Sequence, residues 1–212
     1  MTAFATTPLS EETLKALFKE SDFIQIPATE AEFWQLIELP QYRIEYHYKQ
    51  IVGTMSYAAT NHERLVSNAI FAFRSLLEEE YFEVFGSNRP IYAAECGNVY
   101  EPDVHVIEGI LDEYRYDKTK TASLNPVVLV EVFSPSTKNF DLGIKLDCYK
   151  MIPTLKHIIY IEPDKVHVQV FNRTKRPNEW QNVDYFDLEQ KIRVLGKNIS
   201  LKNIYKKVIL KV

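Results

Sequence analysis

The residues of this chain with the clearest chemical potential are two carboxylates and one ammonium group. Asp103 begins a strand-like run, and Glu131 ends the strongly apolar stretch 127–130. Carboxylates at neighbouring strand ends can hold a divalent cation such as Mg²⁺, which prefers oxygen ligands, and the backbone carbonyl of Val132 can add another. Lys145 follows on a segment that is predicted to be helical, where its charge can steer a water molecule. This pattern is typical of metal-assisted hydrolysis of a phosphodiester bond.

Each of these residues also has a simpler, structural explanation. An Asp that follows a Pro, as Asp103 does, is most often a turn residue. Glu131 can close its strand as one half of a salt bridge, because a buried carboxylate without a partner is costly. Asp141, Lys145 and Tyr149 recur at every fourth position and share one face of a helix. There, an exposed acid–base pair contributes roughly a few tenths of a kcal/mol.

Two further polar residues lie upstream. Glu45 shares the polar face of a predicted strand with Arg43 and His47, and the pattern fits either a metal ligand or a solvated strand residue. His62 begins the longest predicted helix, where a single histidine is more often a surface or capping residue. The same position suits contact with a phosphate or transfer of a proton, because histidine changes its charge near neutral pH.

Length and composition limit the classes of protein to which the chain can belong. Its 212 residues, of which 46% are hydrophobic and 25% are charged, predict one globular domain over residues 1–212. The formal net charge of −4 argues against a domain that binds nucleic acid through a basic surface as a whole. A locally basic groove remains compatible with this charge.

Cysteine usage and hydropathy predict a reduced, cytoplasmic protein. Cys96 and Cys148 match neither a metal-binding spacing nor a disulfide framework, so two packed free thiols are expected. The first residues lack a basic region followed by an apolar core, so no signal peptide is expected. No apolar run is long enough to cross a bilayer, and we expect no contact with a membrane.

The elements that must position these residues follow from apolar periodicity and capping signals. Helices are predicted over residues 11–20, 29–39, 59–81 and 139–151. Strands are predicted over 42–48, 50–56, 81–86, 91–94, 104–108, 127–133, 157–162, 166–172, 180–186 and 191–194. This order indicates a mixed α/β sheet with a strand-rich C-terminal half, in which strand 127–133 is central. An apolar helical face is expected to pack on the sheet: Phe140, Ile144, Cys148 and Ile152.

Several stretches together resemble the Uma2 family (DUF820) of the PD-(D/E)XK, or restriction-endonuclease-like, superfamily. They are EPDVHVI at 101–107, VLVEVFSPST at 128–137, and the spaced set of Asp141, Lys145 and Tyr149. Upstream, YRIEY at 42–46 resembles the Arg-x-Glu stretch of that family, and His62 lies near the start of its long helix. The family usually continues with an Asp-Gly turn after Glu45, which this chain lacks.

The resemblance implies a restriction-endonuclease-like core, in which a central mixed sheet is flanked by helices. The chain then divides into an N-terminal helical segment (1–40), a nuclease core (41–172), and C-terminal strands with a tail (173–212). By resemblance, Asp103 and Glu131 are ligands of Mg²⁺ or Mn²⁺, and Glu45 is a further acidic ligand.

The remaining roles also follow from the resemblance. The superfamily usually places a lysine two residues after the second carboxylate, where this chain has Phe133, so Lys145 is the substitute. Its ammonium group would position the attacking water or offset charge in the transition state. His62, Asp141 and Tyr149 are then supporting residues.

The function implied by the resemblance is a divalent-metal-dependent endonuclease that acts on DNA and forms a homodimer. The main alternative is a noncatalytic module that retains the fold for nucleic-acid binding or assembly, because fold resemblance does not prove activity. A hydrolase of smaller phosphoesters is the third possibility.

Overall fold

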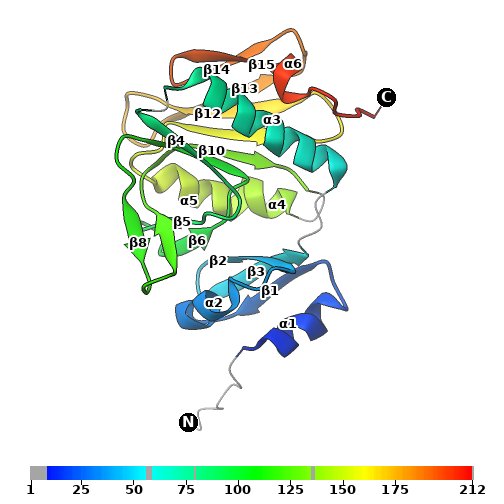
Figure 1. Ribbon diagram of the computed structural model, residues 1–212, viewed down its shortest axis with the longest axis vertical. Helices are drawn as coiled ribbons and strands as arrows, with labels where there is room; N and C mark the ends of the chain where they lie inside the picture. The colour runs from blue at the N-terminus through cyan, green and yellow to red at the C-terminus, as the bar shows by residue number, and fades with distance from the viewer. Residues whose placement is uncertain (1–8, 56–58, 79, 135–136, 212) are drawn as a thin grey trace.

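The computed structural model of the chain describes residues 9–55, 59–78, 80–134 and 137–211 (Figure 1). A central sheet has six strands in the order β13-β12-β11-β10-β7-β4. These strands are β4 (Phe82–Gly86), β7 (Val104–Glu108), β10 (Pro126–Val132), β11 (His157–Ile161), β12 (Val168–Arg173) and β13 (Trp180–Tyr185). β10 and β11 are parallel and the other neighbours are antiparallel, so the prediction of a mixed α/β sheet is confirmed.

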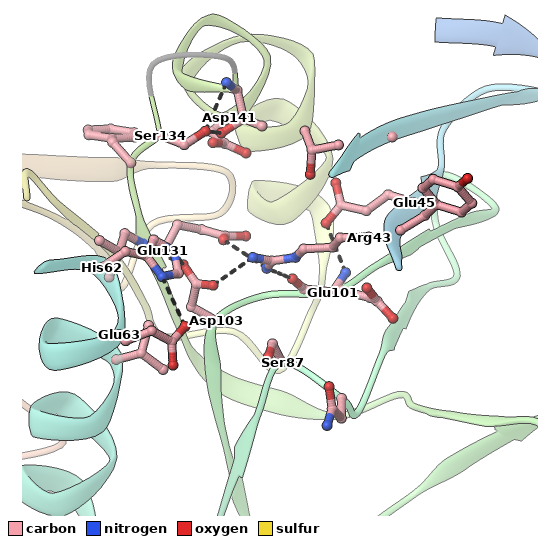
Figure 2. Close-up of a pocket in the computed structure, with 18 of the residues that line it drawn as sticks. Arg43, Glu45, His62, Glu63, Ser87, Glu101, Asp103, Glu131, Ser134 and Asp141 are labelled. Atoms are coloured by element: carbon pink, nitrogen blue, oxygen red, sulfur yellow. Dashed lines mark hydrogen bonds and ion pairs between the residues drawn. The ribbon is translucent and has the colours of Figure 1, made fainter. Parts of the chain in front are cut away.

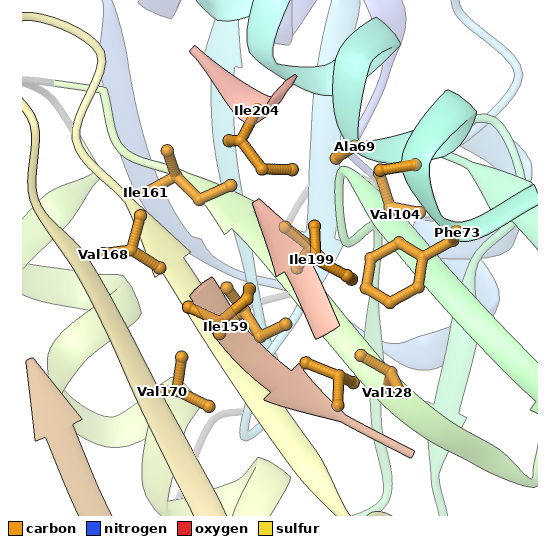
Figure 3. Close-up of a cluster of buried hydrophobic side chains, with 14 of the residues drawn as sticks. Ala69, Phe73, Val104, Val128, Ile159, Ile161, Val168, Val170, Ile199 and Ile204 are labelled. Atoms are coloured by element: carbon orange, nitrogen blue, oxygen red, sulfur yellow. The ribbon is translucent and has the colours of Figure 1, made fainter. Parts of the chain in front are cut away.

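One face of the central sheet is covered by α3 (Thr60–Leu76), α6 (Leu201–Ile204), β14 (Lys191–Val194) and β15 (Lys197–Ser200). Figure 3 shows Val128, Ile159 and Val170 of the sheet below Ile199 and Phe73. The strand predicted over 191–194 forms, but it does not belong to the central sheet. β14 pairs with β15 in a separate two-stranded sheet and packs its apolar side chains on the face of the larger one.

The opposite face is covered by α4 (Lys138–Phe140), the π-helical turn η1 (Asp141–Lys145) and α5 (Leu146–Met151). The single helix predicted over 139–151 is therefore interrupted by a kink at Gly143. The predicted apolar face is only partly correct: Cys148 and Ile152 are buried, but Ile144 is 47% exposed. Asp141 and Lys145 are buried instead, because charged groups that neutralise one another can enter a protein interior.

The N-terminal part of the chain belongs to a second sheet, with the strand order β1-β3-β2-β6-β5-β9-β8. Its strands are β1 (Phe23–Pro27), β2 (Tyr42–Tyr46), β3 (Gln50–Met55), β5 (Ile91–Ala93), β6 (Asn98–Tyr100), β8 (Glu113–Arg115) and β9 (Thr121–Ser123). The helices α1 (Glu11–Phe18) and α2 (Glu30–Leu36) form an apolar core with β1–β3. The capping signal at the start of the helix predicted over 29–39 is a capping box between Thr29 and Glu32.

The hairpin of β2 and β3 forms although the Asp-Gly pair typical of the family is missing. Tyr48 and Lys49 occupy the two-residue turn with φ angles of 45° and 62°. The backbone groups of His47 and Gln50 bond each other across it, which is the pattern of a type I′ turn. The buried strand residues therefore impose a backbone conformation that neither turn residue favours.

Cys96 and Cys148 are joined by a disulfide, with 6.1 Å between their Cα atoms. The prediction of two free thiols is wrong because the fold brings the turn between β5 and β6 against α5. Residues that the sequence separates widely are thus covalently linked, and sequence spacing alone gave no sign of it. Among the described residues, no helix has the length and apolar character needed to cross a membrane.

Candidate active site

Asp103 and Glu131 come together because of the register between two neighbouring strands. β7 and β10 are antiparallel, with Val104 opposite Val130. Continuing this register by one residue places Asp103 opposite Glu131, and paired residues point to the same face of a sheet. Alternate residues of β10 pack toward α3, so Glu131 points to the other face, which α5 covers.

Three donors hold the two oxygens of Asp103 (Figure 2). The backbone N–H of Val132 donates to Oδ2 at 2.7 Å, and His62 Nε2 lies 3.2 Å from the same oxygen. Arg43 donates through Nη1 to Oδ1 at 2.8 Å. Burial alone would raise the pKa of Asp103, but Arg43 and His62 hold it well below the usual range. His62 is therefore part of the site rather than a solvated helix start.

Lys145 is buried among three carboxylates. Its Nζ lies 2.8 Å from Glu45 Oε1, 2.9 Å from Glu131 Oε1 and 3.3 Å from Asp141 Oδ1. Burial alone would lower the pKa of Lys145, but these carboxylates raise it well above its ordinary value. The explanation of Lys145 and Asp141 as an exposed helical pair is wrong, and the ammonium group is a permanent cation.

Tyr149 supports Glu131 from α5. Its hydroxyl donates to Glu131 Oε1 at 2.7 Å. Burial raises the pKa of Tyr149 well above its ordinary value, so the hydroxyl keeps the proton that it donates. Burial also raises the pKa of Glu131, to about 7, although Lys145 opposes this shift. Burial raises the pKa of Asp141 as well.

Glu45 reaches this cluster from β2 of the second sheet. Its Oε1 accepts a hydrogen bond from the backbone N–H of Glu101 at 2.9 Å, in addition to the bond from Lys145. The side chain is buried, so the alternative of a solvated strand residue is wrong. Glu45 thus ties the N-terminal sheet to the helix that carries Lys145.

Two residues of the cluster were not predicted as site residues. Arg43 donates to the backbone carbonyl of Glu101 and to Asp103, and its Nη2 lies 4.0 Å from Glu131 Oε2. Side chains alternate along β2, so Arg43 lies on the same face of the strand as Glu45. This pattern was the sequence signal that could have identified Arg43 as a site residue. Burial raises the pKa of Glu101 to about 8.

The clustered side chains open into a cleft of about 1460 Å³. Its walls come from both sheets, the start of α3, the end of β10 and the segment that carries Lys145 (Figure 2). The cleft brings together all but one of the predicted site residues: Glu45, His62, Asp103, Glu131, Val132, Asp141 and Lys145. Tyr149 is fully buried next to Glu131. Acidic side chains outnumber lysine and arginine among the lining residues.

Most of the chain matches a known protein family. The Uma2 family model, described as "Putative restriction endonuclease", matches residues 30–201. This chain belongs to the Uma2 family. The uncharacterized protein sll1609 of Synechocystis sp. is 30% identical over 135 residues, which cover 63% of this chain and 74% of that protein.

A solved structure shows the same Uma2 fold. It is a protein of Anabaena variabilis ATCC 29413, described as a "putative nuclease belonging to DUF820". The two structures superpose with a TM-score of 0.67 at 17% sequence identity, over 86% of this chain and 100% of the other. The restriction-endonuclease-like fold implied by the sequence is therefore confirmed.

The carboxylates that line this cleft meet some requirements of a metal centre. Within the described residues, no three His, Cys, Asp or Glu side chains converge in metal-binding geometry. Lys145 draws Glu45 and one oxygen of Glu131 to itself, while Arg43 bonds one oxygen of Asp103. The donor set is nevertheless of the type that hard cations need, with adjacent carboxylates and an excess of acidic over basic groups.

Proposed function

We propose that this protein is a divalent-metal-dependent endonuclease that hydrolyses phosphodiester bonds in DNA. The observation that carries the proposal is the buried pairing of Lys145 with Glu131, beside Asp103, at the wall of a large cleft. Burying a charged cluster is costly, and in a cleft such a cluster is more often functional than structural. The family description supports nucleic acid as the substrate.

Asp103 and Glu131 would hold the metal ion, Mg²⁺ or Mn²⁺, with the carbonyl of Val132 as a further ligand. The excess of carboxylates over cations among the lining residues favours such an ion. When bound, it would supply Lewis-acid polarisation of the scissile phosphate. Glu45 accepts hydrogen bonds from Lys145 and from the Glu101 N–H. We therefore assign it the main role of orienting Lys145, with contact to the ion as a secondary role.

Lys145 would act as a fixed positive charge rather than as a base. Its raised pKa keeps it protonated, so it cannot accept the proton of an attacking water. A preoriented cation beside the reacting phosphate stabilises the charge that develops in the transition state. Lys145 reaches Glu131 from the helical segment, which explains how the position of Phe133 can lack the usual lysine.

His62 is the group in the cleft best suited to move a proton. Burial alone would lower the pKa of His62, but its contact with Asp103 raises it above the ordinary value, which favours the protonated imidazole. We assign it the role of donating that proton to the leaving oxygen, or of contacting the phosphate.

The test combines metal binding and cleavage on the same samples. Mn²⁺ is titrated calorimetrically into wild type, Asp103→Asn and Glu131→Gln, and each sample is incubated with supercoiled plasmid. We expect both variants to lose metal binding and nicking. Glu108→Gln is the matched control, because Glu108 is an exposed residue at the far end of β7. Wild type that binds Mn²⁺ but cleaves neither DNA nor RNA would contradict the endonuclease proposal.

A noncatalytic module is the second candidate, and one observation favours it. The chain supplies its own cations to the buried carboxylates through Lys145 and Arg43, so the cluster can serve purely to join the two sheets. Nucleic-acid binding without cleavage, and without any effect of Mn²⁺, would select this candidate.

A further inference from the structure

Asp103 and Glu131 each have one carboxylate oxygen that other groups of the protein bind and a second oxygen that faces Arg43. Asp103 Oδ2 is bound by the backbone of Val132 and contacts His62. Glu131 Oε1 is bound by Tyr149 and Lys145. These contacts fix the orientation of each carboxylate from the side of the protein interior.

The second oxygen of each carboxylate faces Arg43. Nη1 donates to Asp103 Oδ1 at 2.8 Å, and Nη2 lies 4.0 Å from Glu131 Oε2. No other ion pair to either oxygen occurs among the described residues. One planar guanidinium group therefore faces the second oxygen of both carboxylates, which is a position that a cation shared by the two would also take.

Arg43 is also anchored, so that its position is defined. Nη2 donates to the backbone carbonyl of Glu101, and the side chain is 27% exposed toward the cleft. Burial alone would lower the pKa of Arg43, but Asp103 and Glu131 are the first groups that raise it well above its ordinary value. The charge of Arg43 is thus directed at the same two residues that we assign as metal ligands.

We propose that Arg43 is a built-in counter-cation that competes with a divalent metal ion for Asp103 Oδ1 and Glu131 Oε2. This inference rests on the proposed function, because it takes these two carboxylates as the metal ligands. The guanidinium group keeps the carboxylates paired in the absence of the ion, and it moves aside toward the cleft when the ion binds. Two cations cannot share these oxygens closely without strong repulsion.

The competition predicts opposite effects of one substitution on stability and on metal affinity. In EDTA, Arg43→Gln is expected to lower the midpoint temperature of unfolding, because two buried carboxylates lose one of the positive charges that face them. Calorimetric titration with Mn²⁺ is expected to show affinity that is roughly tenfold higher than in wild type. Mn²⁺ should consequently raise the midpoint of the variant by more than that of wild type.

Arg89→Gln is the matched control. Arg89 also lines the cleft and is similarly exposed, at 22%, but it pairs with Glu113 instead of a proposed ligand. Its loss should leave Mn²⁺ affinity at the wild-type value. Arg43→Lys is the second variant if Arg43→Gln fails to fold, because it keeps the charge. One ammonium cannot face both oxygens, so its Mn²⁺ affinity should lie between those of wild type and the Gln variant.

The outcomes separate this proposal from the endonuclease assignment. Unchanged or weaker Mn²⁺ binding in a folded Arg43 variant, with wild type binding and cleaving normally, would overturn the competition and leave the endonuclease standing. Tighter Mn²⁺ binding in the variant, without cleavage by any sample, would support the competition and overturn the endonuclease. If neither wild type nor the variant binds Mn²⁺, both proposals fall.

Discussion

Lys145 makes more ion pairs than any other cation among the described residues of the site. It is the shared partner of Glu45, Glu131 and Asp141, and it is only 2% exposed. Replacing it with Met leaves three carboxylates around an apolar side chain. We expect Lys145→Met to lower the free energy of unfolding by about 3–5 kcal/mol, as is usual when one member of a buried ion pair is removed. Urea denaturation at pH 7 measures this change.

Lys138→Met provides the control at the residue scale. Lys138 pairs with Glu162 near the surface, where such pairs contribute about 0–1 kcal/mol. If the two substitutions lowered the free energy of unfolding equally, the cluster around Lys145 would be solvated and would stabilise the fold no more than a surface ion pair does. Adding Glu131→Gln to Lys145→Met should recover part of the loss, because it removes one of the unpaired charges.

At this scale, sequence reasoning named the candidate ligands and their partners His62, Lys145 and Tyr149, but not Arg43. Asp103 and Glu131 follow from their places at the start and the end of predicted strands, from the cost of ending an apolar strand in a carboxylate, and from the family resemblance. Arg43 did not follow, because its partner lies far along the chain and only the packing of the two sheets brings them together. Long-range pairs of charges leave no periodic signal, whereas local patterns such as the capping box at Thr29 do.

At the scale of elements, the central strands and the helical segment that carries Lys145 were predictable, but the kink within that segment was not. An unbroken apolar run predicts a strand buried on both faces, which β10 is. The backbone of Gly143 is not helical, so the next residue, Ile144, leaves the apolar face that regular periodicity assigns to it, whereas Cys148 and Ile152 stay on that face. The separate hairpin β14–β15 was not predicted, because the alternation of apolar residues identifies a strand but not the strand with which it pairs.

His105 on β7 should give the protein a dependence on acid pH. The ring is fully buried, its Nε2 lies 3.1 Å from Ser123 Oγ, and burial lowers its pKa to about 3. The unfolded chain takes up this proton near pH 6.5 and the folded chain does not. The contribution of neutral His105 to the free energy of unfolding is therefore fully present above pH 6.5. It decreases as the pH falls toward 3, by at most about 1.4 kcal/mol per pH unit.

The variant His105→Gln isolates this contribution. Glutamine can still bond Ser123 but does not titrate, so we expect a flatter decrease in unfolding free energy between pH 6.5 and pH 4 than in wild type. Denaturant titrations at intervals of half a pH unit measure both slopes. Parallel slopes would mean that His105 is already protonated in the folded protein.

The disulfide should contribute to the stability of the element that carries Lys145. It closes a loop with a sequence separation of 52 residues between the β5–β6 turn and α5. Loop-closure entropy for this length corresponds to about 4 kcal/mol. Dithiothreitol is expected to lower the unfolding free energy of wild type by this order and to leave Cys96→Ser unchanged. Detection of two free thiols in the native protein before reduction would contradict the prediction.

At the scale of the whole molecule, the predicted homodimer and the cytoplasmic location stay predictions. Light scattering of the purified protein would measure the oligomeric state directly. The acidic character of the chain has a consequence for the proposed substrate that does not depend on oligomeric state. A net charge of −4 and a cleft with more acidic than basic lining residues should repel a phosphate backbone.

DNA binding should therefore require a divalent cation, beyond any requirement for cleavage. Ca²⁺ also takes oxygen ligands, so it can neutralise Asp103 and Glu131 and bridge to a phosphate. We expect the fluorescence anisotropy of a labelled duplex to show at least about tenfold weaker binding in EDTA than in Ca²⁺ at equal ionic strength. Glu131→Gln should bind in EDTA as well as or better than wild type but gain little from Ca²⁺, because it lacks one negative charge and one ligand. Equal binding of wild type in EDTA and Ca²⁺ would place the DNA outside the cleft.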